Sequence, residues 1–265
     1  MIAVFGTGAM GTALLSGLLD AGTPPSTLVI VDPDSGRAGR VAEQFGVRAV
    51  TAAEAATAGV LLIVVPPQAV PAVLREVSPT LAANSLVVSC AAGVPIRRLE
   101  ELLPADTAVI RAMPNAAVVA HAGMSVLSRG TSASDEDLKR AAELLGAVGE
   151  VLVVPEAQQD AATALSGSGP AYFYEFFDAL ITAGTAQGLT NADATTMVLQ
   201  AAAGAVAMAR HTGHSPAKLR DQVATPGGTT RAALDVLAER GVPAAIGDAV
   251  AAATARSREL AGNGG

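Results

Sequence analysis

The chain has 265 residues, of which 51% are hydrophobic and only 3% are aromatic, and its formal net charge is -7. This length predicts one large or two modest domains, packed mainly by alanine, valine and leucine. An acidic balance without a basic stripe argues against a nucleic-acid partner. Cys90 is the only cysteine, which excludes a disulfide framework and a thiolate metal site.

The hydrophobic runs predict a cytoplasmic protein with no membrane partner. The chain opens without a basic leader region, and the longest apolar run, residues 60–65, is far shorter than the ~20 residues of a membrane span. The three histidines do not have a metal-binding spacing, so we expect no metal. Cys90 is interpreted as a small buried hydrophobic residue.

A short apolar strand is predicted at residues 2–5, and residues 6–11 follow it with the spacing G-x-G-x-x-G. Residues 12–21 then have the apolar periodicity of a helix, with Gly22 as its stop. A strand, a glycine turn and a helix in this order are typical of a dinucleotide-binding unit. The alternative is a glycine turn in another kind of βα unit.

Each glycine of this motif has a separate role. Gly6 permits the tight turn, Gly8 lets the backbone approach a pyrophosphate, and Gly11 lets the helix pack against the strand. Ala9 and Met10 lie between them, at the start of the helix. We therefore predict that these five residues contact a nicotinamide dinucleotide.

A second strand at residues 28–31 ends at Asp32, 21 residues after the last glycine of the motif. An acidic residue there suits the ribose 2′-hydroxyl of NAD and repels the 2′-phosphate of NADP. Ser35, Arg37 and Arg40 follow closely enough to reach a phosphate, and Arg37 is included in the predicted cofactor site. The alternative for Asp32 is a turn residue at the end of a strand.

Strands and helices alternate through the rest of the N-terminal half. Strands are expected at 48–50, 60–65, 85–89, 108–110 and 151–155, with helices at 70–77 and 95–103 and a helix start capped by Ser134. This alternation predicts an α/β fold with a doubly wound, mostly parallel sheet in residues 1–155. Ligands bind at the carboxyl ends of such strands. The residues expected to line the cofactor crevice there are Val65, Pro66, Pro67, Ala91, Ala92, Gly93, Met113 and Asn115.

From Glu156 onward the pattern predicts only helices. They are expected at 158–165, 172–187, 191–211, 216–223, 230–240 and 243–260. Residues 201–207 are apolar on all sides, which requires burial, and a partner subunit is the expected cover. We therefore expect a homodimer or higher homo-oligomer formed through the helical half.

Residues 225–230 read Thr-Pro-Gly-Gly-Thr-Thr and precede an amphipathic helix. Thr229 or Thr230 is the expected N-cap. The turn and the helix start together present unpaired N–H groups, which form a small anion pocket. The alternative is an ordinary capped helix after a tight turn.

The helical half also contains a glycine-rich break at residues 164–172, which is expected to kink the helix before Pro170. Together with residues 111–115, 216–223 and 225–230, this segment strongly resembles the Δ1-pyrroline-5-carboxylate reductase family, over essentially the whole chain. The resemblance implies a Rossmann-type domain, residues 1–155, followed by an all-helical substrate and dimerisation domain, residues 156–265. It implies reduction of the C=N bond of pyrroline-5-carboxylate by NAD(P)H to L-proline.

The resemblance also implies roles for the loop. Gly228, Thr229 and Thr230 would hold the substrate carboxylate, and Thr225 would contribute its hydroxyl. The hydroxyl of Thr230 would hydrogen-bond the ring nitrogen as a donor or proton relay, which makes Thr230 the predicted catalytic residue.

One segment departs from the family pattern. Val65-Pro66-Pro67 stands where the family usually has Val-Lys-Pro, so a lysine expected near the cofactor is missing. With Asp32, this predicts that NADH is used at least as well as NADPH. The remaining alternatives are a reductase of another cyclic imine and a non-catalytic NAD(P)-binding sensor. A β-hydroxyacid dehydrogenase is disfavoured, because enzymes of that class resemble one another in having a catalytic lysine on a helix of the second domain. Here the second half contains only Lys218, which lies beside the Thr225 loop and outside a helix of the needed pattern.

Overall fold

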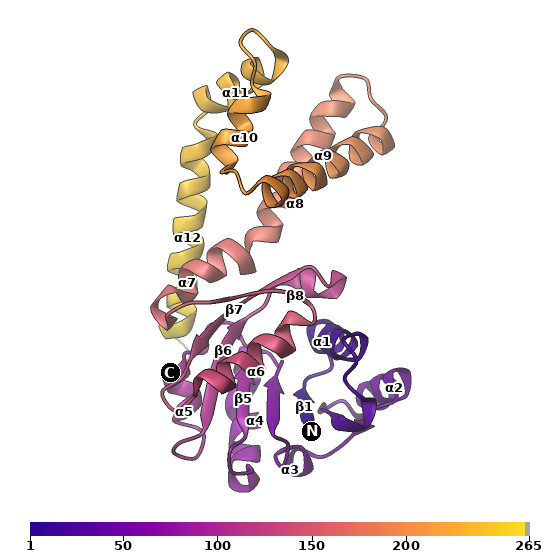
Figure 1. Ribbon diagram of the computed structural model, residues 1–265, viewed down its shortest axis with the longest axis vertical. Helices are drawn as coiled ribbons and strands as arrows, with labels where there is room; N and C mark the ends of the chain where they lie inside the picture. Colours follow the sequence, from indigo (N-terminus) through magenta and orange to yellow (C-terminus); the bar gives the residue numbers. More distant parts are fainter. Residues whose placement is uncertain (263–265) are drawn as a thin grey trace. The chain divides into compact units, whose positions relative to one another are not determined.

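The computed structural model describes residues 1–262 as two compact units. Unit 1 comprises residues 1–170 and the segment from Ala252 onward, and unit 2 comprises residues 171–251. The chain passes between the units within two helices, α8 (Gly169–Ala186) and α12 (Val242–Gly262) (Figure 1). Residues 263–265 of the predicted helical domain lie outside the described residues.

Unit 1 is built on one eight-stranded sheet with the order β3-β2-β1-β4-β5-β6-β7-β8 (Figure 1). The strands are β1 Ile2–Phe5, β2 Leu28–Val31, β3 Arg48–Ala49, β4 Val60–Ile63, β5 Leu86–Ser89, β6 Ala108–Met113, β7 Gly123–Arg129 and β8 Gly149–Val153. All neighbours are parallel except β6 and β7, which are antiparallel. This confirms the doubly wound, mostly parallel sheet, with β7 as an additional strand that the sequence pattern did not predict.

Alternate residues of each strand point to opposite faces of the sheet, and a separate apolar core covers each face. Val4 and Leu62 belong to one core, whereas Phe5 and Leu61 belong to the other. Helices α1 (Ala9–Asp20), α2 (Ser35–Phe45) and α6 (Asp135–Gly146) pack on the first face, and α3 (Ala52–Ala55), α4 (Val70–Val77) and α5 (Ile96–Glu100) on the second. Burying one such leucine stabilises the fold by about 1.5–3 kcal/mol.

The ends of two helices follow the sequence signals. Gly22 has φ +91° and closes α1 through its N–H bond to Leu19 O at 2.9 Å, while the next N–H bonds to Leu18 O at 2.9 Å. Ser134 caps α6, and Asp137 completes a capping box by accepting from the Ser134 N–H. Burial acts to raise the pKa of Asp137, but its hydrogen bonds with Ser134 and the nearby Arg140 lower it on balance. Both predicted helix boundaries are confirmed.

Several predicted elements differ in length. Strand β4 ends at Ile63 and not at residue 65, and β6 continues to Met113 and not only to residue 110. The helix expected at 158–165 is a single turn, α7 (Gln159–Ala162), followed by a π-helical segment, Thr163–Gly167. Short 3₁₀ turns lie at Pro25–Thr27, Pro67–Ala69, Ser78–Thr80, Ala116–Ala120 and Glu156–Gln158.

Unit 2 is helical. It contains most of α8 and the part of α12 before Ala252, together with α9 (Asn191–Thr212), α10 (Pro216–Val223) and α11 (Thr229–Glu239). Along the whole of α9, Ala194 is the only residue that is buried in the described chain. By length and composition α9 could cross a membrane, but this is weak evidence because a soluble core helix passes the same test.

Candidate active site: a glycine turn and an uncapped helix start

The glycine turn joins β1, the third strand in the order of the sheet, to α1. Gly6 has φ +95°, which favours glycine, and its N–H donates to Val31 O at 2.8 Å. A Cβ on Gly11 would lie 1.9 Å from Gly6 O, so α1 can pack this closely only with glycine there. A Cβ on Gly8 would meet no described atom within 4 Å, so the turn is open on the side where a ligand is expected.

Helix α1 begins at Ala9 with Gly8 as its N-cap, and no side chain of the described chain caps it. The first N–H groups of a helix lack internal partners, and the helix dipole adds positive potential at this end. Gly8 and Ala9 are exposed and Met10 is half-buried. The chain therefore offers a pyrophosphate-sized anion site at the position that the spacing of the glycines predicts.

Asp32, at the end of β2, is almost completely surrounded by donors. Its Oδ2 accepts from both the N–H and the hydroxyl of Thr7 at 2.8 Å, and its Oδ1 accepts from the Asp34 N–H at 2.9 Å. Arg37 donates to both oxygens. Burial by itself would raise the pKa of Asp32, but the hydrogen bonds from Arg37, Thr7 and Asp34 outweigh it and hold the pKa well below its ordinary range. Asp32 is therefore ionised at neutral pH.

Because β1, β4, β5 and β6 are parallel, the segments after them meet at one edge of the sheet. This edge carries the glycine turn and all the other predicted crevice residues. Pro66 and Ala92 are exposed, while Val65, Pro67, Gly93 and Met113 are half-buried. Ala91 is buried. A Cβ on Gly93 would lie 3.5 Å from the Cβ of Leu260, so the end of α12 packs over this glycine.

Asn115 differs from the rest of this set because the residue is only 8% exposed and its side chain is hydrogen-bonded to the protein. Its Oδ1 accepts from the N–H groups of Ala117 and Met124, and its Nδ2 donates to Ser166 O at 3.0 Å. The sequence places Asn115 at the crevice but does not reveal these partners. Cys90, after β5, lies in the apolar core, where burial raises the pKa of its thiol to about 12.

The loop before α11 forms a tight turn. The Gly228 N–H donates to Thr225 O at 3.0 Å across Pro226 and Gly227, and Gly227 has φ +71°. Proline followed by a glycine at positive φ is the pattern of a type II turn. A Cβ on Gly228 would lie 2.6 Å from the Thr225 hydroxyl oxygen, so a side chain at this position would collide with the turn.

The predicted N-cap of α11 is wrong. Gly228, and not Thr229 or Thr230, occupies the cap position, because the turn leaves Gly228 in an extended conformation and the helix begins at Thr229. No side chain of the described chain caps this helix start. The first N–H groups of α11 and the two threonine hydroxyls are therefore available to a ligand, which makes the site a better anion pocket than a capped helix would be.

The glycine turn and the loop before α11 belong to different units. The residues predicted to bind the cofactor lie in unit 1, and the loop 225–230 lies in unit 2.

Known protein families match both the N-terminal and the C-terminal part of the chain. The family model described as pyrroline-5-carboxylate reductase dimerisation matches residues 156–260, and the model described as NADP oxidoreductase, coenzyme F420-dependent, matches residues 1–93. A pyrroline-5-carboxylate reductase of Mycobacterium leprae is 39% identical, with 98% of this chain and 96% of that protein covered. The chain belongs to the pyrroline-5-carboxylate reductase family.

Solved structures of pyrroline-5-carboxylate reductases show the same fold. The Coxiella burnetii enzyme superimposes with a TM-score of 0.94 at 32% identity, covering 98% of this chain and 97% of that one. The Plasmodium falciparum enzyme, solved with NADP bound, gives 0.87 at 27% identity over the same shares. A Rossmann-like N-terminal half and a helical C-terminal half are thus established for this family member.

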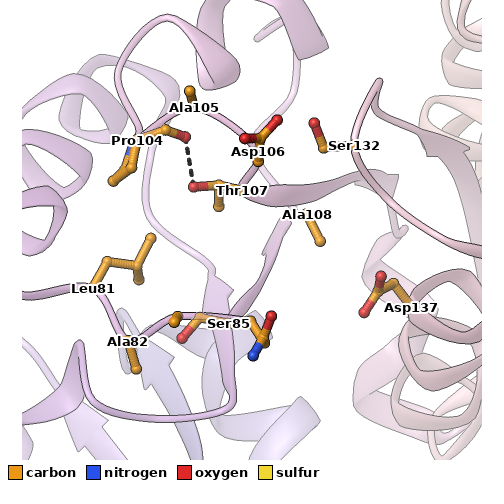
Figure 2. A pocket seen from close by; sticks show the side chains of 12 residues that line it. Leu81, Ala82, Ser85, Pro104, Ala105, Asp106, Thr107, Ala108, Ser132 and Asp137 are labelled. Atoms are coloured by element: carbon orange, nitrogen blue, oxygen red, sulfur yellow. Dashed lines mark hydrogen bonds between the residues drawn. The ribbon is translucent and has the colours of Figure 1, made fainter.

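A hollow of about 460 Å³ with a mixed polar and apolar lining lies at the opposite edge of the sheet, where β5 and β6 begin. Figure 2 shows Asp106, Thr107, Ser132 and Asp137 around it, with the Thr107 hydroxyl bonded to Pro104 O. None of the residues predicted for the cofactor or the substrate lines this hollow. The hollow is therefore separate from the reductase site that the sequence predicts.

Proposed function

We propose that this chain reduces the C=N bond of Δ1-pyrroline-5-carboxylate to L-proline with a hydride from NAD(P)H. The main support for this proposal is the start of α11, which follows the Thr225–Gly228 turn and has N–H groups that no side chain of the described chain caps. Such a site suits the carboxylate of a small substrate. The names of the relatives agree with this reaction.

The glycine turn fits a nicotinamide dinucleotide. The open side of Gly8 and the uncapped N-terminus of α1 would hold the pyrophosphate, and Asp32 and Arg37 lie at the ribose edge. The remaining contacts with the dinucleotide are proposed at the segments that follow the strands, at Val65, Pro66, Pro67, Ala91, Ala92, Gly93 and Met113. The dinucleotide supplies a hydride when it is bound.

In the proposed reaction, the imine carbon receives the hydride and the ring nitrogen receives a proton, so that C=N becomes CH–NH. The N–H groups of Gly228, Thr229 and Thr230 bind the substrate carboxylate, with the Thr225 hydroxyl beside them. The hydroxyl of Thr230 orients the ring nitrogen and relays its proton from water, because a threonine hydroxyl is too weak an acid to protonate the imine alone. Most of the rate enhancement then comes from placement and electrostatics.

We further propose that NADH is used at least as well as NADPH. The ionised Asp32 carboxylate at the ribose edge disfavours a 2′-phosphate, and Val65-Pro66-Pro67 provides no lysine to bind one. Arg37 offsets part of the carboxylate charge, so the preference is expected to be moderate.

The dimerisation-domain match supports homo-oligomerisation, and we propose that the helical half, residues 156–265, forms a homodimer or a higher assembly. Residues 1–155 form the cofactor domain in this proposal. An apolar groove of about 410 Å³ between α8 and α9 favours a second copy of the chain as the cover. Large exposed apolar side chains on these two helices include Phe173, Tyr174, Phe176, Leu180, Met197 and Leu199, of which Phe176, Leu180 and Met197 line the groove. We place the protein in the cytoplasm.

The proposal is tested by following oxidation of NADH, and separately of NADPH, with pyrroline-5-carboxylate and by identifying proline as the product. Thr230→Ala should lower kcat by about 10-fold or more while leaving cofactor affinity unchanged. Thr230→Ser keeps the hydroxyl and should retain most of the activity. Cofactor binding without turnover in the unmodified protein would instead favour the sensor, and turnover with other cyclic imines alone would favour the imine reductase.

A further inference from the structure

The side chain of Asn115 joins the end of β6 to the π-helical segment Thr163–Gly167. Its oxygen faces two N–H groups and its nitrogen faces a carbonyl, so the hydrogen-bond network fixes the orientation of the amide. Only 8% of the residue is exposed, so little of the amide remains for a cofactor. The amide therefore serves the protein backbone.

The acceptor of this bond, the Ser166 carbonyl, lacks its usual helical partner. In an α-helix the carbonyl of residue 166 accepts from the N–H of residue 170, but residue 170 is proline and has no N–H. The Nδ2 of Asn115 donates to Ser166 O at 3.0 Å in its place. The turn here is π-helical and therefore wider than that of an α-helix: the Ser168 N–H donates to Thr163 O, five residues earlier, at 2.9 Å.

The segment is held close to the sheet on both sides of this bond. A Cβ on Gly167 would lie 2.8 Å from the Cε of Met113, so the segment lies close to the Met113 side chain at the end of β6. Before the segment, Gln159 is fully buried, and its Nε2 donates to Ser128 Oγ at 2.8 Å. The π-helical segment is thereby fixed beside the carboxyl end of β6, the edge at which the cofactor is expected.

We infer that Asn115 is a positioning residue, which holds the backbone of Ser166–Gly169 at the crevice and does not bind the cofactor itself. This inference rests on the proposed reductase function. It replaces the predicted cofactor contact of Asn115 with an indirect role. Short π-helical segments in other proteins are frequently found at functional sites, which agrees with a role in arranging this one.

Asn115→Asp tests the inference because it keeps the shape and both acceptor bonds but turns an oxygen toward the Ser166 carbonyl. We expect kcat to fall by about 10-fold or more through misplacement of the segment, while the Kd of NADH, measured by fluorescence titration, changes less than about 2-fold. Hydrogen exchange of the peptide covering residues 163–171 should become faster. Asn115→Ser keeps an acceptor for the Ala117 N–H but cannot reach the Ser166 carbonyl. If the aspartate variant does not fold, the serine variant should show the same loss of kcat, the same unchanged Kd and the same faster exchange.

Pro170→Ala provides the matched rescue. It restores an N–H that can donate to the Ser166 carbonyl, so Asn115→Ser with Pro170→Ala should recover kcat and slow exchange relative to Asn115→Ser alone. An unchanged kcat in both Asn115 variants would overturn the inference, and so would a weakened NADH affinity with normal kcat at saturation, which indicates direct cofactor contact. Failure of the proposed function itself is distinguishable, because the unmodified protein would then not reduce pyrroline-5-carboxylate.

Discussion

Arg37 binds Asp32 with two atoms of its guanidinium group: Nη2 lies 2.7 Å from Oδ1 and Nε lies 3.1 Å from Oδ2. The Asp32 side chain is 2% exposed, whereas the Arg37 side chain is 43% exposed. The carboxylate is therefore occupied by protein donors, and the guanidinium is the more accessible charge at the edge where we propose that the ribose binds.

This arrangement predicts that Arg37 contributes to kcat/KM with NADPH. Replacing it in Arg37→Gln should lower kcat/KM with NADPH by about 10-fold, a loss of about 1.4 kcal/mol, and change kcat/KM with NADH much less. Steady-state assays with each cofactor measure the two effects, and Arg75→Gln, at an exposed position of α4, is the control. An equal loss with both cofactors would contradict a selective role for Arg37.

The lowered pKa of Asp32 predicts a pH-dependent contribution to stability. A carboxyl group whose folded pKa lies below its ordinary value of 3.8 stabilises the fold at neutral pH, and this contribution is lost as the pH falls below about 4 toward the folded pKa. Asp32→Asn should therefore cost about 1–3 kcal/mol at neutral pH, and the difference from the unmodified protein should shrink on acidification.

Urea unfolding at several pH values measures this difference. Glu43→Gln, at an exposed position of α2, is the control and should change the free energy of unfolding little at any pH. A cost of Asp32→Asn that stays constant as the pH falls would show that the carboxylate charge is not responsible.

The contact between Gly11 and Gly6 predicts a steric effect. A methyl group on residue 11 would lie 1.9 Å from Gly6 O, so Gly11→Ala must move α1 or the turn, at a cost of about 1–3 kcal/mol, and should abolish tight NADH binding. Gly39→Ala, at an open position of α2, should instead stabilise the protein by about 0.5–1 kcal/mol. Urea midpoints and NADH titration of both variants provide the comparison.

The turn before α11 predicts an effect on substrate affinity. Gly228→Ala brings a methyl group within 2.6 Å of the Thr225 hydroxyl oxygen, so the Thr225 side chain or the turn must shift, and KM for pyrroline-5-carboxylate should rise by about 10-fold. NADH affinity should not change. Gly146→Ala, where a methyl group meets no described atom within 4 Å, controls for the loss of a glycine. An unaltered KM would place the substrate carboxylate elsewhere.

The groove between α8 and α9 predicts where the chain associates. Leu180 lines this groove and is 43% exposed, so Leu180→Asp would bury a charge in the assembly and should lower the oligomer mass measured by light scattering. Gln44→Asp adds a charge at an exposed position of unit 1 and should leave the mass unchanged. Retention of the full oligomer in Leu180→Asp would argue against this groove as the contact.

Local patterns in the sequence were sufficient for the β1–turn–α1 unit and for the long helices. Gly6 and Gly11 are required by backbone conformation and close approach, which depend on neighbouring residues in the chain. Strand β7 was missed, because glycine and two serines lie among its few apolar residues and resemble a loop, and it becomes a strand through its pairing with both β6 and β8.

The sequence by itself determined the fold class, the family and the positions of the glycine turn and the loop before α11. Only the tertiary structure decided that Asp32 is surrounded by donors from Thr7 and Arg37, that Gly228 and not a threonine stands at the N-cap position of α11, and that Asn115 binds Ser166. Thr7 and Asp32 are 25 residues apart, and Asn115 and Ser166 are 51 residues apart. Partners that far apart in the chain meet only through the order and register of the strands, whereas composition and spacing describe what lies within a few residues.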